Sequence, residues 1–313
     1  MNSRLSQALP VSCPHAAPDA ESVFLDRIRE SCRFGLLEEV YTTPKPGLVD
    51  LHDSGAHKDM DCASFEASEQ AVTPYMAEMA KAGWRHEKEL TALFPSIRPL
   101  GLECEQAMLQ ATGGVNTHKG IIFSLGIIVS CLGYARRRLG PVSPQTLFSL
   151  CQSAVRPWLL RDFQEMRQRE PQTHGERLFA QYGIRGIRGE AMDGFPSLAQ
   201  AALPAMEQAA RLQPDPNSAR LAVLLTLMAQ VDDTNILSRS SPATLDYVKA
   251  RSRAFIRRHP IIGPKAILEL EEMNQDFIRR NISPGGCADL LAIAVFFKRF
   301  AELEEGGLLC TKN

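Results

Sequence analysis

Hydrophobic residues recur along most of the chain at the spacing of an amphipathic helix. In the segment 21–40, Phe24, Ile28, Cys32, Leu36 and Val40 stand four residues apart, which places their side chains on one face of a helix. Two prolines in the following segment, 42–47, would end that helix. The same spacing predicts further helices over residues 62–93, 99–111, 118–139, 143–157, 174–182, 196–212, 217–230, 241–256, 264–280 and 286–304.

Two of these segments are apolar on nearly all sides, and no segment shows the alternation of a strand. IIFSLGIIVSCLGYA (121–135) and ARLAVLLTLMAQV (219–231) are typical of helices buried in the middle of a large helical assembly. Residues 1–20 mix Pro, Ser and Ala without periodicity, which predicts a poorly ordered tail. We therefore expect an all-α protein with one large helical catalytic domain over residues 21–313.

Composition narrows the function classes. The formal net charge of -1 argues against a general nucleic-acid-binding surface. No apolar run reaches the roughly 18 to 20 residues that span a bilayer, and no signal sequence is visible, so we expect a cytoplasmic protein without a membrane partner. The eight cysteines include no C-x-x-C pair, which gives little support to a zinc knuckle or a disulfide scaffold.

Five polar segments interrupt the helices, and all fall at predicted helix junctions. They are TPKPGLVDLHDSGAHKDMD (43–61), CEQAMLQATGGVNTHKG (104–120), GIRGIRGEAMDGFP (183–196), DDTNILSR (232–239) and RNISPGGCADLL (280–291). Free backbone N–H groups at helix starts favour anions. The segments supply cations for phosphate oxygens, namely Lys45, Lys119, Arg188, Arg239 and Arg280. They also supply carboxylates that could bind a metal ion or transfer a proton, namely Asp59, Glu105, Glu190, Asp233 and Asp289.

Each polar segment also has a purely structural interpretation. TGGVNTHKG (112–120) does not fit a phosphate-binding P-loop, because Lys119 is followed by Gly120 and the preceding residues predict a helix. The glycines could serve only to end helices, and Ser283-Pro284 fits an ordinary helix start. Asp233 could cap a helix instead of binding Mg²⁺. His57 near Asp59 resembles a metal cluster, although a lone loop histidine more often serves as a hydrogen-bonding strut.

The order of the motifs resembles the triphosphoribosyl-dephospho-CoA synthase family. The resemblance rests on PKPGLVD with GAHKDM, ATGGVNTHKG, RGEA with GFP, DTN with SR, and SPGGCADLL, from about residue 35 to 300. It implies an all-helical enzyme that joins ATP to 3'-dephospho-CoA, releases adenine and makes the prosthetic-group precursor of citrate lyase and malonate decarboxylase. It also implies that the product passes to an acyl-carrier-protein holo-synthase transferase. Two positions depart from the family pattern, because Ser240-Ser241 replaces an expected glycine pair and Cys287 replaces a serine.

The resemblance gives the polar residues expected roles. We expect Asp233 or Glu190 to accept the proton of the attacking hydroxyl. We expect Mg²⁺ to bridge phosphate oxygens, with ligands drawn from Asp59, Glu105 and Asp233. The expected substrate and phosphate contacts are Lys45, Gly114, Asn116, His118, Lys119, Arg188, Arg239, Gly285 and Gly286.

Two other functions are compatible with an all-helical chain of this kind. A Mg²⁺-dependent nucleotide pyrophosphohydrolase would use the same acidic and basic residues, but it would release pyrophosphate instead of adenine. A non-enzymatic helical adaptor would show no saturable ATP binding. The sequence is also compatible with an oligomer.

Overall fold

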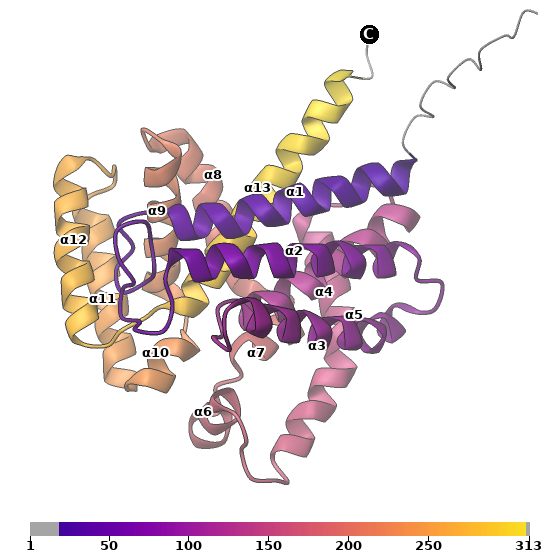
Figure 1. Ribbon diagram of the computed structural model, residues 1–313, viewed down its shortest axis with the longest axis horizontal. Helices are drawn as coiled ribbons and strands as arrows, with labels where there is room; N and C mark the ends of the chain where they lie inside the picture. The colour runs from indigo at the N-terminus through magenta and orange to yellow at the C-terminus, as the bar shows by residue number, and fades with distance from the viewer. Residues whose placement is uncertain (1–18, 311–313) are drawn as a thin grey trace, which may run out of the picture.

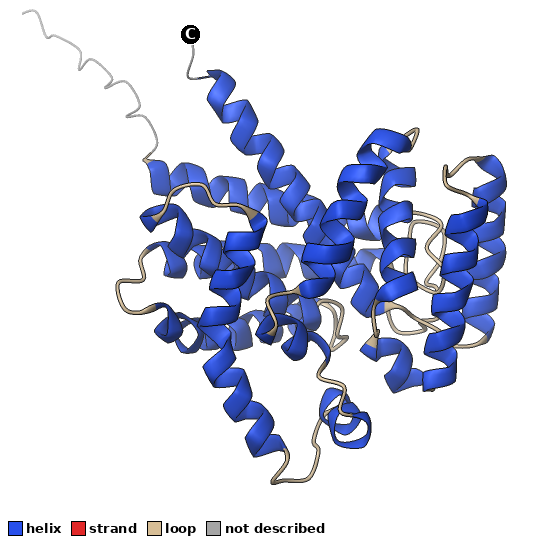
Figure 2. Cartoon of the chain, turned by 180° about the vertical axis from the view of Figure 1, so that it is seen from behind, coloured by secondary structure: helices blue, strands red, loops and turns tan. Residues whose placement is uncertain are grey.

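The computed structural model describes residues 19–310, which form helices joined by loops without any strand (Figures 1 and 2). A 3₁₀ turn at Leu90–Ala92 and a π-helical turn at Leu198–Ala202 supplement the α-helices. The α-helices are α1 (Ala20–Tyr41), α2 (Cys62–Trp84), α3 (Leu93–Ala111), α4 (Lys119–Arg138), α5 (Pro144–Met166), α6 (His174–Tyr182), α7 (Gly186–Met192), α8 (Leu203–Leu212), α9 (Pro216–Gln230), α10 (Thr234–Arg239), α11 (Pro242–Arg258), α12 (Pro264–Arg279) and α13 (Gly285–Cys310).

The apolar helix α4 lies in the core, as its sequence predicts. It is long and apolar enough to cross a membrane, but 72% of its apolar window is buried inside the protein. Its apolar surface is therefore used for packing against other helices. The second apolar helix, α9, is likewise largely buried.

The first two helices run side by side and present a long loop at one end of the molecule. Figure 1 shows α1 and α2 as neighbours joined by the loop 42–61, with α13 packed along α1. Helix α2 also packs tightly on α4, because a Cβ added at Gly83 would lie 1.8 Å from the carbonyl oxygen of Ser130. This packing fixes the end of α2 relative to α4, so the loops at their ends have defined positions.

The structure confirms the all-α prediction and changes some boundaries. Helix α2 ends at Trp84 instead of continuing to residue 93, and α5 extends to Met166. The short helices α7 and α10 lie inside polar segments, where no apolar periodicity announces them. The predicted tail falls largely on residues 1–18, outside the described residues, and α1 begins at Ala20 with Asp19 as its cap.

Candidate active site

Four polar segments meet around one cavity near the start of α4. This α4 cavity has a volume of about 130 Å³. Its wall combines the loop after α1, the start of α4, helix α10 and the start of α13. Its polar lining residues include Glu39, Lys45, His57, Asn116, His118, Lys119, Asn235, Arg239, Ser283 and Asp289.

A second and larger cavity adjoins the first. This α7 cavity has a volume of about 530 Å³ and lies between the segment containing α7 and the start of α10. It includes the glycines of the GIRGIRGE motif, and its acidic lining residues are Glu190, Asp193, Asp232, Asp233 and Asp289. Gly120, Asn235 and Asp289 line both cavities, so the two spaces meet at these residues.

Asp289 is the carboxylate at the junction of the two cavities. A Cβ added at Gly120 would lie 2.1 Å from Oδ2 of Asp289, so glycine at this position leaves room for the carboxylate in its present place. Burial raises the pKa of Asp289 well above its usual range, and the nearby Glu39 and Asp233 raise it further. No hydrogen bond within residues 19–310 contributes to this shift. The chemistry of Asp289 therefore suits a proton acceptor.

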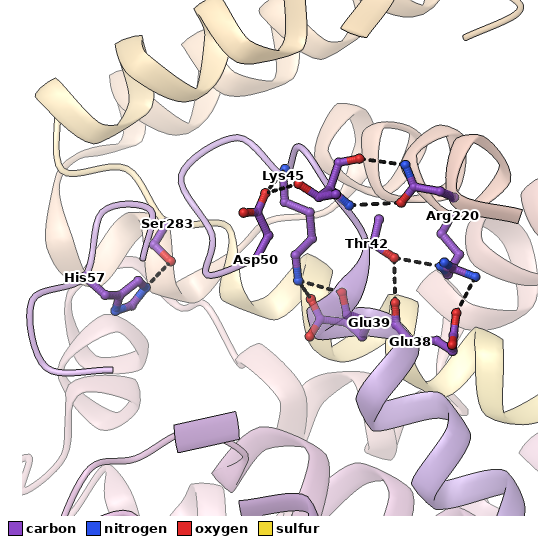
Figure 3. Close-up of polar contacts among 10 residues, drawn as sticks. Glu38, Glu39, Thr42, Lys45, Asp50, His57, Arg220 and Ser283 are labelled. Carbon is purple, nitrogen blue, oxygen red and sulfur yellow. Dashed lines mark hydrogen bonds and ion pairs between the residues drawn. The ribbon is translucent and has the colours of Figure 1, made fainter. Parts of the chain in front are cut away.

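Lys45 lies in this region, but its ammonium group is already paired. Figure 3 shows its side chain extending to the end of α1, where Nζ donates to the carbonyl oxygen of Glu39 at 2.7 Å and to the Glu39 carboxylate. Lys45 is 1% exposed and Glu39 is 3% exposed. The loop is held in place by Asp50, whose Oδ2 accepts the backbone N–H of Lys45 at 2.8 Å. Lys45 therefore belongs to the cavity wall as one half of a buried ion pair, and its phosphate contact stays a prediction.

His118 occupies the position just before α4 and lines the same cavity, with one ring nitrogen unpaired. It is 2% exposed, and its Nδ1 lies 2.6 Å from Oγ of Ser68 on α2. Its Nε2 is buried and has no hydrogen-bond partner among the described residues. Burial, assisted by the charge of Lys45, lowers the pKa of His118 to about 3. The imidazole is therefore neutral at physiological pH.

Arg239 connects α10 to the loop 42–61 and to the start of α13. Its Nη2 donates to Oδ1 of Asn281 at 2.6 Å and to the carbonyl oxygen of Ala56, and its Nη1 lies 3.4 Å from Nδ1 of His57. The other ring nitrogen of His57 lies 2.8 Å from Oγ of Ser283 (Figure 3). Burial and the charge of Arg239 lower the pKa of His57. These contacts close one side of the α4 cavity.

Lys119 is the most accessible cation of the α4 cavity. Its side chain is 58% exposed, and Nζ lies 2.7 Å from Oε2 of Glu105 on α3. Oδ1 of Asn116 accepts the backbone N–H of Lys119 at 3.1 Å, which orders the first turn of α4. An exposed ion pair of this kind contributes little to stability, so Lys119 can exchange Glu105 for a ligand phosphate at small cost.

The two carboxylates that the sequence indicated as proton acceptors both have structural partners. Asp233 is 1% exposed and caps α10, where Oδ1 accepts the N–H groups of Asn235 at 2.8 Å and Ile236 at 3.3 Å. Its Oδ2 accepts the N–H of Cys287 on α13 at 2.9 Å. Burial raises the pKa of Asp233, while these N–H groups oppose the shift. Asp233 therefore joins α10 to α13, which agrees with the capping alternative.

Glu190 lies on the wall of the α7 cavity, and its oxygens hold the following turn. Oε1 accepts the hydroxyl of Ser197 at 2.8 Å, and Oε2 accepts the N–H of the same residue at 3.1 Å. Burial raises the pKa of Glu190. Arg188, two residues earlier on α7, lines a third cavity with Glu105 instead of the α4 cavity, and its Nη1 lies 3.5 Å from Sδ of Met166. Arg188 therefore lies outside the wall of the α4 cavity.

The glycines of the motifs divide between packing and turn geometry. Gly285 lies in the α4 cavity wall and Gly286 in the α7 cavity wall, at the start of α13. A Cβ added at Gly286 would lie 3.0 Å from Oδ2 of Asp233, so these glycines let α13 approach α10. Gly114 has a φ of +95° in the loop before α4, lines neither cavity and has open space beside it. Gly114 therefore serves the turn, because glycine adopts a positive φ without steric cost.

The replacement of the expected glycine pair by Ser240-Ser241 has a simple structural outcome. The two φ angles are -150° and -148°, which are values that any residue adopts. Ser241 caps α11 by accepting the N–H of Thr244. Ser241 therefore serves as an ordinary N-cap residue at this junction.

The three expected metal ligands do not form one centre. Asp59 is 65% exposed beside His57, Glu105 is paired with Lys119, and both oxygens of Asp233 accept backbone N–H groups. Within the part of the chain that the structure describes, no three His, Cys, Asp or Glu side chains are grouped to hold a metal ion. These residues do not fit a protein-held metal centre. A Mg²⁺ ion that is bound mainly by substrate phosphates needs only one or two carboxylates.

Comparisons with known proteins identify the family of the chain. The model of the family described as ATP:dephospho-CoA triphosphoribosyl transferase matches residues 25–307. The chain is 42% identical to a probable 2-(5''-triphosphoribosyl)-3'-dephosphocoenzyme-A synthase of Pectobacterium carotovorum, over 86% of this chain and 87% of the relative. It is 38% identical to the synthase of Escherichia fergusonii, over 86% and 89%. It is 35% identical to a probable synthase of Streptococcus mutans, over 86% and 94%. No solved structure matches the chain.

Proposed function

The chain belongs to the ATP:dephospho-CoA triphosphoribosyl transferase family, and we propose that its reaction takes place where the α4 and α7 cavities meet. The protein is a transferase that joins ATP to 3'-dephospho-CoA, releases adenine and yields 2'-(5''-triphosphoribosyl)-3'-dephospho-CoA. The observation that carries the proposed location is the Asp289 carboxylate, which borders both cavities. A nucleotide pyrophosphohydrolase is not favoured by these relatives.

Charge suggests which substrate each cavity takes. The α4 cavity has Lys119 and Arg239 in its wall together with the start of α4, whose N–H groups attract anions. We assign the triphosphate of ATP to this cavity. The α7 cavity is larger and its wall is rich in carboxylates, which disfavours a triphosphate. We assign the ribose end of dephospho-CoA, with its attacking 2'-hydroxyl, to the α7 cavity.

Asp289 is placed to accept the proton at the junction. In the proposed reaction the 2'-oxygen forms a bond to C1'' of the ATP ribose, and the bond from C1'' to adenine breaks. The hydroxyl proton passes to Asp289, the bonding electrons leave with adenine, and a proton is returned to the adenine from Asp289 or water. Such a displacement gains from a nearby carboxylate because the ribose carries positive charge in the transition state.

The triphosphate acts as a binding handle, because no phosphate bond breaks in this reaction. Binding energy from the phosphates can hold C1'' against the acceptor hydroxyl, and well-oriented intramolecular reactions gain about 7–11 kcal/mol in this way. We propose that Mg²⁺ enters with ATP and neutralises part of the phosphate charge. Asp59 would supply an exposed carboxylate, because its Oδ1 lies 3.9 Å from Nδ1 of His57 in the cavity wall.

We further propose that the product passes to an acyl-carrier-protein holo-synthase transferase that serves citrate lyase or malonate decarboxylase. A cytoplasmic location is proposed as well. The cysteines of the described residues are free thiols, which is consistent with a reducing compartment.

Product identity tests the proposed function. The purified protein is incubated with ATP, Mg²⁺ and dephospho-CoA, and the products are separated by chromatography and identified by mass. We expect one adenine for each triphosphoribosyl-dephospho-CoA, and no adenine when dephospho-CoA is omitted. Release of pyrophosphate without adenine would overturn the proposal and favour the hydrolase.

Lys119 provides a test of the triphosphate assignment. We expect Lys119→Ala to raise the KM for ATP about tenfold, because one charge-assisted contact to phosphate contributes about 1.5 kcal/mol. The KM for dephospho-CoA should change little. Glu105→Gln is the matched control, because it releases Lys119 from its ion pair without removing the cation. An unchanged KM for ATP in Lys119→Ala would place the triphosphate elsewhere.

A further inference from the structure

Two unpaired buried N–H groups belong to the wall of the α4 cavity. Within residues 19–310, five buried side-chain nitrogen or oxygen atoms have no hydrogen-bond partner. Two of them, Nε2 of His118 and Nε of Arg239, belong to residues that line this cavity. Buried polar atoms are nearly always paired in folded proteins, so two unpaired nitrogens on the residues of one cavity wall are available to a ligand of that cavity.

A chain of hydroxyl groups determines which nitrogen of His118 carries the proton. The hydroxyl of Thr117 donates to Oγ of Ser68 at 2.7 Å. Oγ of Ser68 lies 2.6 Å from Nδ1 of His118, and the single hydroxyl proton of Ser68 is free to be donated there. Nδ1 is then the acceptor, and the proton of the neutral ring is on Nε2.

The surroundings of His118 keep its ring fixed and uncharged. The ring packs edge-to-face against Phe65, with centroids 5.1 Å apart, and Phe65 also lines the α4 cavity. Protonation of Nδ1 would break the hydrogen bond from Ser68 and would place a second positive charge near Lys45. A neutral imidazole N–H can still polarise a ligand oxygen strongly.

We propose that Nε2–H of His118 and Nε–H of Arg239 bind phosphate oxygens of a linear polyphosphate chain, and that Thr117 and Ser68 are positioning residues that hold His118 in the donating tautomer. The assignment of that polyphosphate to ATP rests on the proposed function. The chemistry of the subsite rests only on the two unpaired donors and the hydroxyl chain. Neither Ser68 nor Thr117 needs to touch the ligand.

Binding of inorganic tripolyphosphate to the full chain tests the subsite without any turnover. Calorimetric titration should give at least about tenfold weaker binding for His118→Asn, whose amide can replace only Nδ1. His118→Gln, whose amide can reach the position of Nε2, should bind within about threefold of the unmodified protein. Arg239→Lys keeps the charge but removes Nε–H, and it should also bind about tenfold more weakly. Unchanged binding in both His118→Asn and Arg239→Lys would overturn the proposal.

The tautomer is tested separately by ¹⁵N NMR of histidine-labelled protein. We expect a protonated Nε2 and an unprotonated Nδ1 for His118. Thr117→Val removes the first donor while keeping the shape, so it should admit the other tautomer and weaken tripolyphosphate binding several-fold. Thr117→Ser keeps the hydroxyl, so it should show the same His118 tautomer and the same tripolyphosphate binding as the unmodified protein. A proton on Nδ1 in the unmodified protein would overturn the positioning role.

These measurements are independent of the proposed function. If adenine release is absent but the tripolyphosphate pattern is found, the subsite stands and only its assignment to ATP fails. If adenine release is present and none of the variants alters tripolyphosphate binding, the proposed reaction stands and this inference fails.

Discussion

Asp289→Asn is expected to lower the rate of adenine transfer about 10²- to 10⁴-fold, the usual effect of removing a general base. The asparagine has nearly the same shape but cannot accept the hydroxyl proton. In the unmodified protein, kcat/KM should rise with pH as Asp289 ionises, and this rise should lie above the usual range of an aspartate because the pKa of Asp289 is raised. The variant should lack that rise. Initial rates of adenine release over a pH series measure both effects.

The same substitution should leave the fold at least as stable as before. A carboxyl group whose pKa is raised by folding stabilises the protein below its unfolded pKa, and that stability is lost as pH rises through the folded pKa. Neutral pH lies above the unfolded pKa of an aspartate, so the raised pKa of Asp289 costs stability there, and Asn removes this cost. We expect an equal or higher midpoint of urea unfolding for Asp289→Asn at pH 7. A clear loss of stability would indicate a structural role instead.

Two further variants separate the carboxylate's position from its charge. Gly120→Ala would place a Cβ 2.1 Å from Oδ2 of Asp289, so the carboxylate must move and activity should fall with the acid group still present. Asp246→Asn is the control, because Asp246 is exposed on α11 and lines neither cavity. It should keep full activity. An Asp289→Asn rate within about threefold of the unmodified protein would mean that another group accepts the proton.

Lys45→Met is expected to lower the free energy of unfolding by about 3–5 kcal/mol, because it leaves the buried Glu39 carboxylate without its cation. The methionine has a similar length and fills most of the same space. Urea unfolding at pH 7 measures the change. Removal of the exposed Lys119 should change stability by less than about 1 kcal/mol, which makes Lys119→Ala the matched control.

A double variant shows whether the unpaired charge is the cause. Lys45→Met combined with Glu39→Gln removes both charges of the pair, so we expect it to recover most of the lost stability. If the double variant is as unstable as Lys45→Met alone, lost packing around the loop after α1 is responsible. A loss below about 1 kcal/mol in Lys45→Met would show that Glu39 finds water or another partner.

Much of the site's location is visible in the sequence. Asn116, His118 and Lys119 come from one motif and Arg239 from another far along the chain, and the structure places all of them on the wall of one cavity. Polar residues at helix junctions are a local signal, because helix ends expose backbone groups that need partners. Asp289 belongs to the same inventory of acidic residues, but its chemistry is not distinguishable from that of Asp233 or Glu190 by sequence alone.

The sequence by itself determined the helices, because amphipathic spacing is a property of neighbouring residues, and it determined the family through the order of its motifs. Tertiary structure decided which ionisable groups are free to act. Lys45 is paired with Glu39, Asp233 accepts N–H groups from α10 and α13, and Asp289 is left against Gly120 without such partners. The reason is physical: the pKa and reactivity of a side chain depend on water and charges within a few ångströms, and packing between distant segments supplies them.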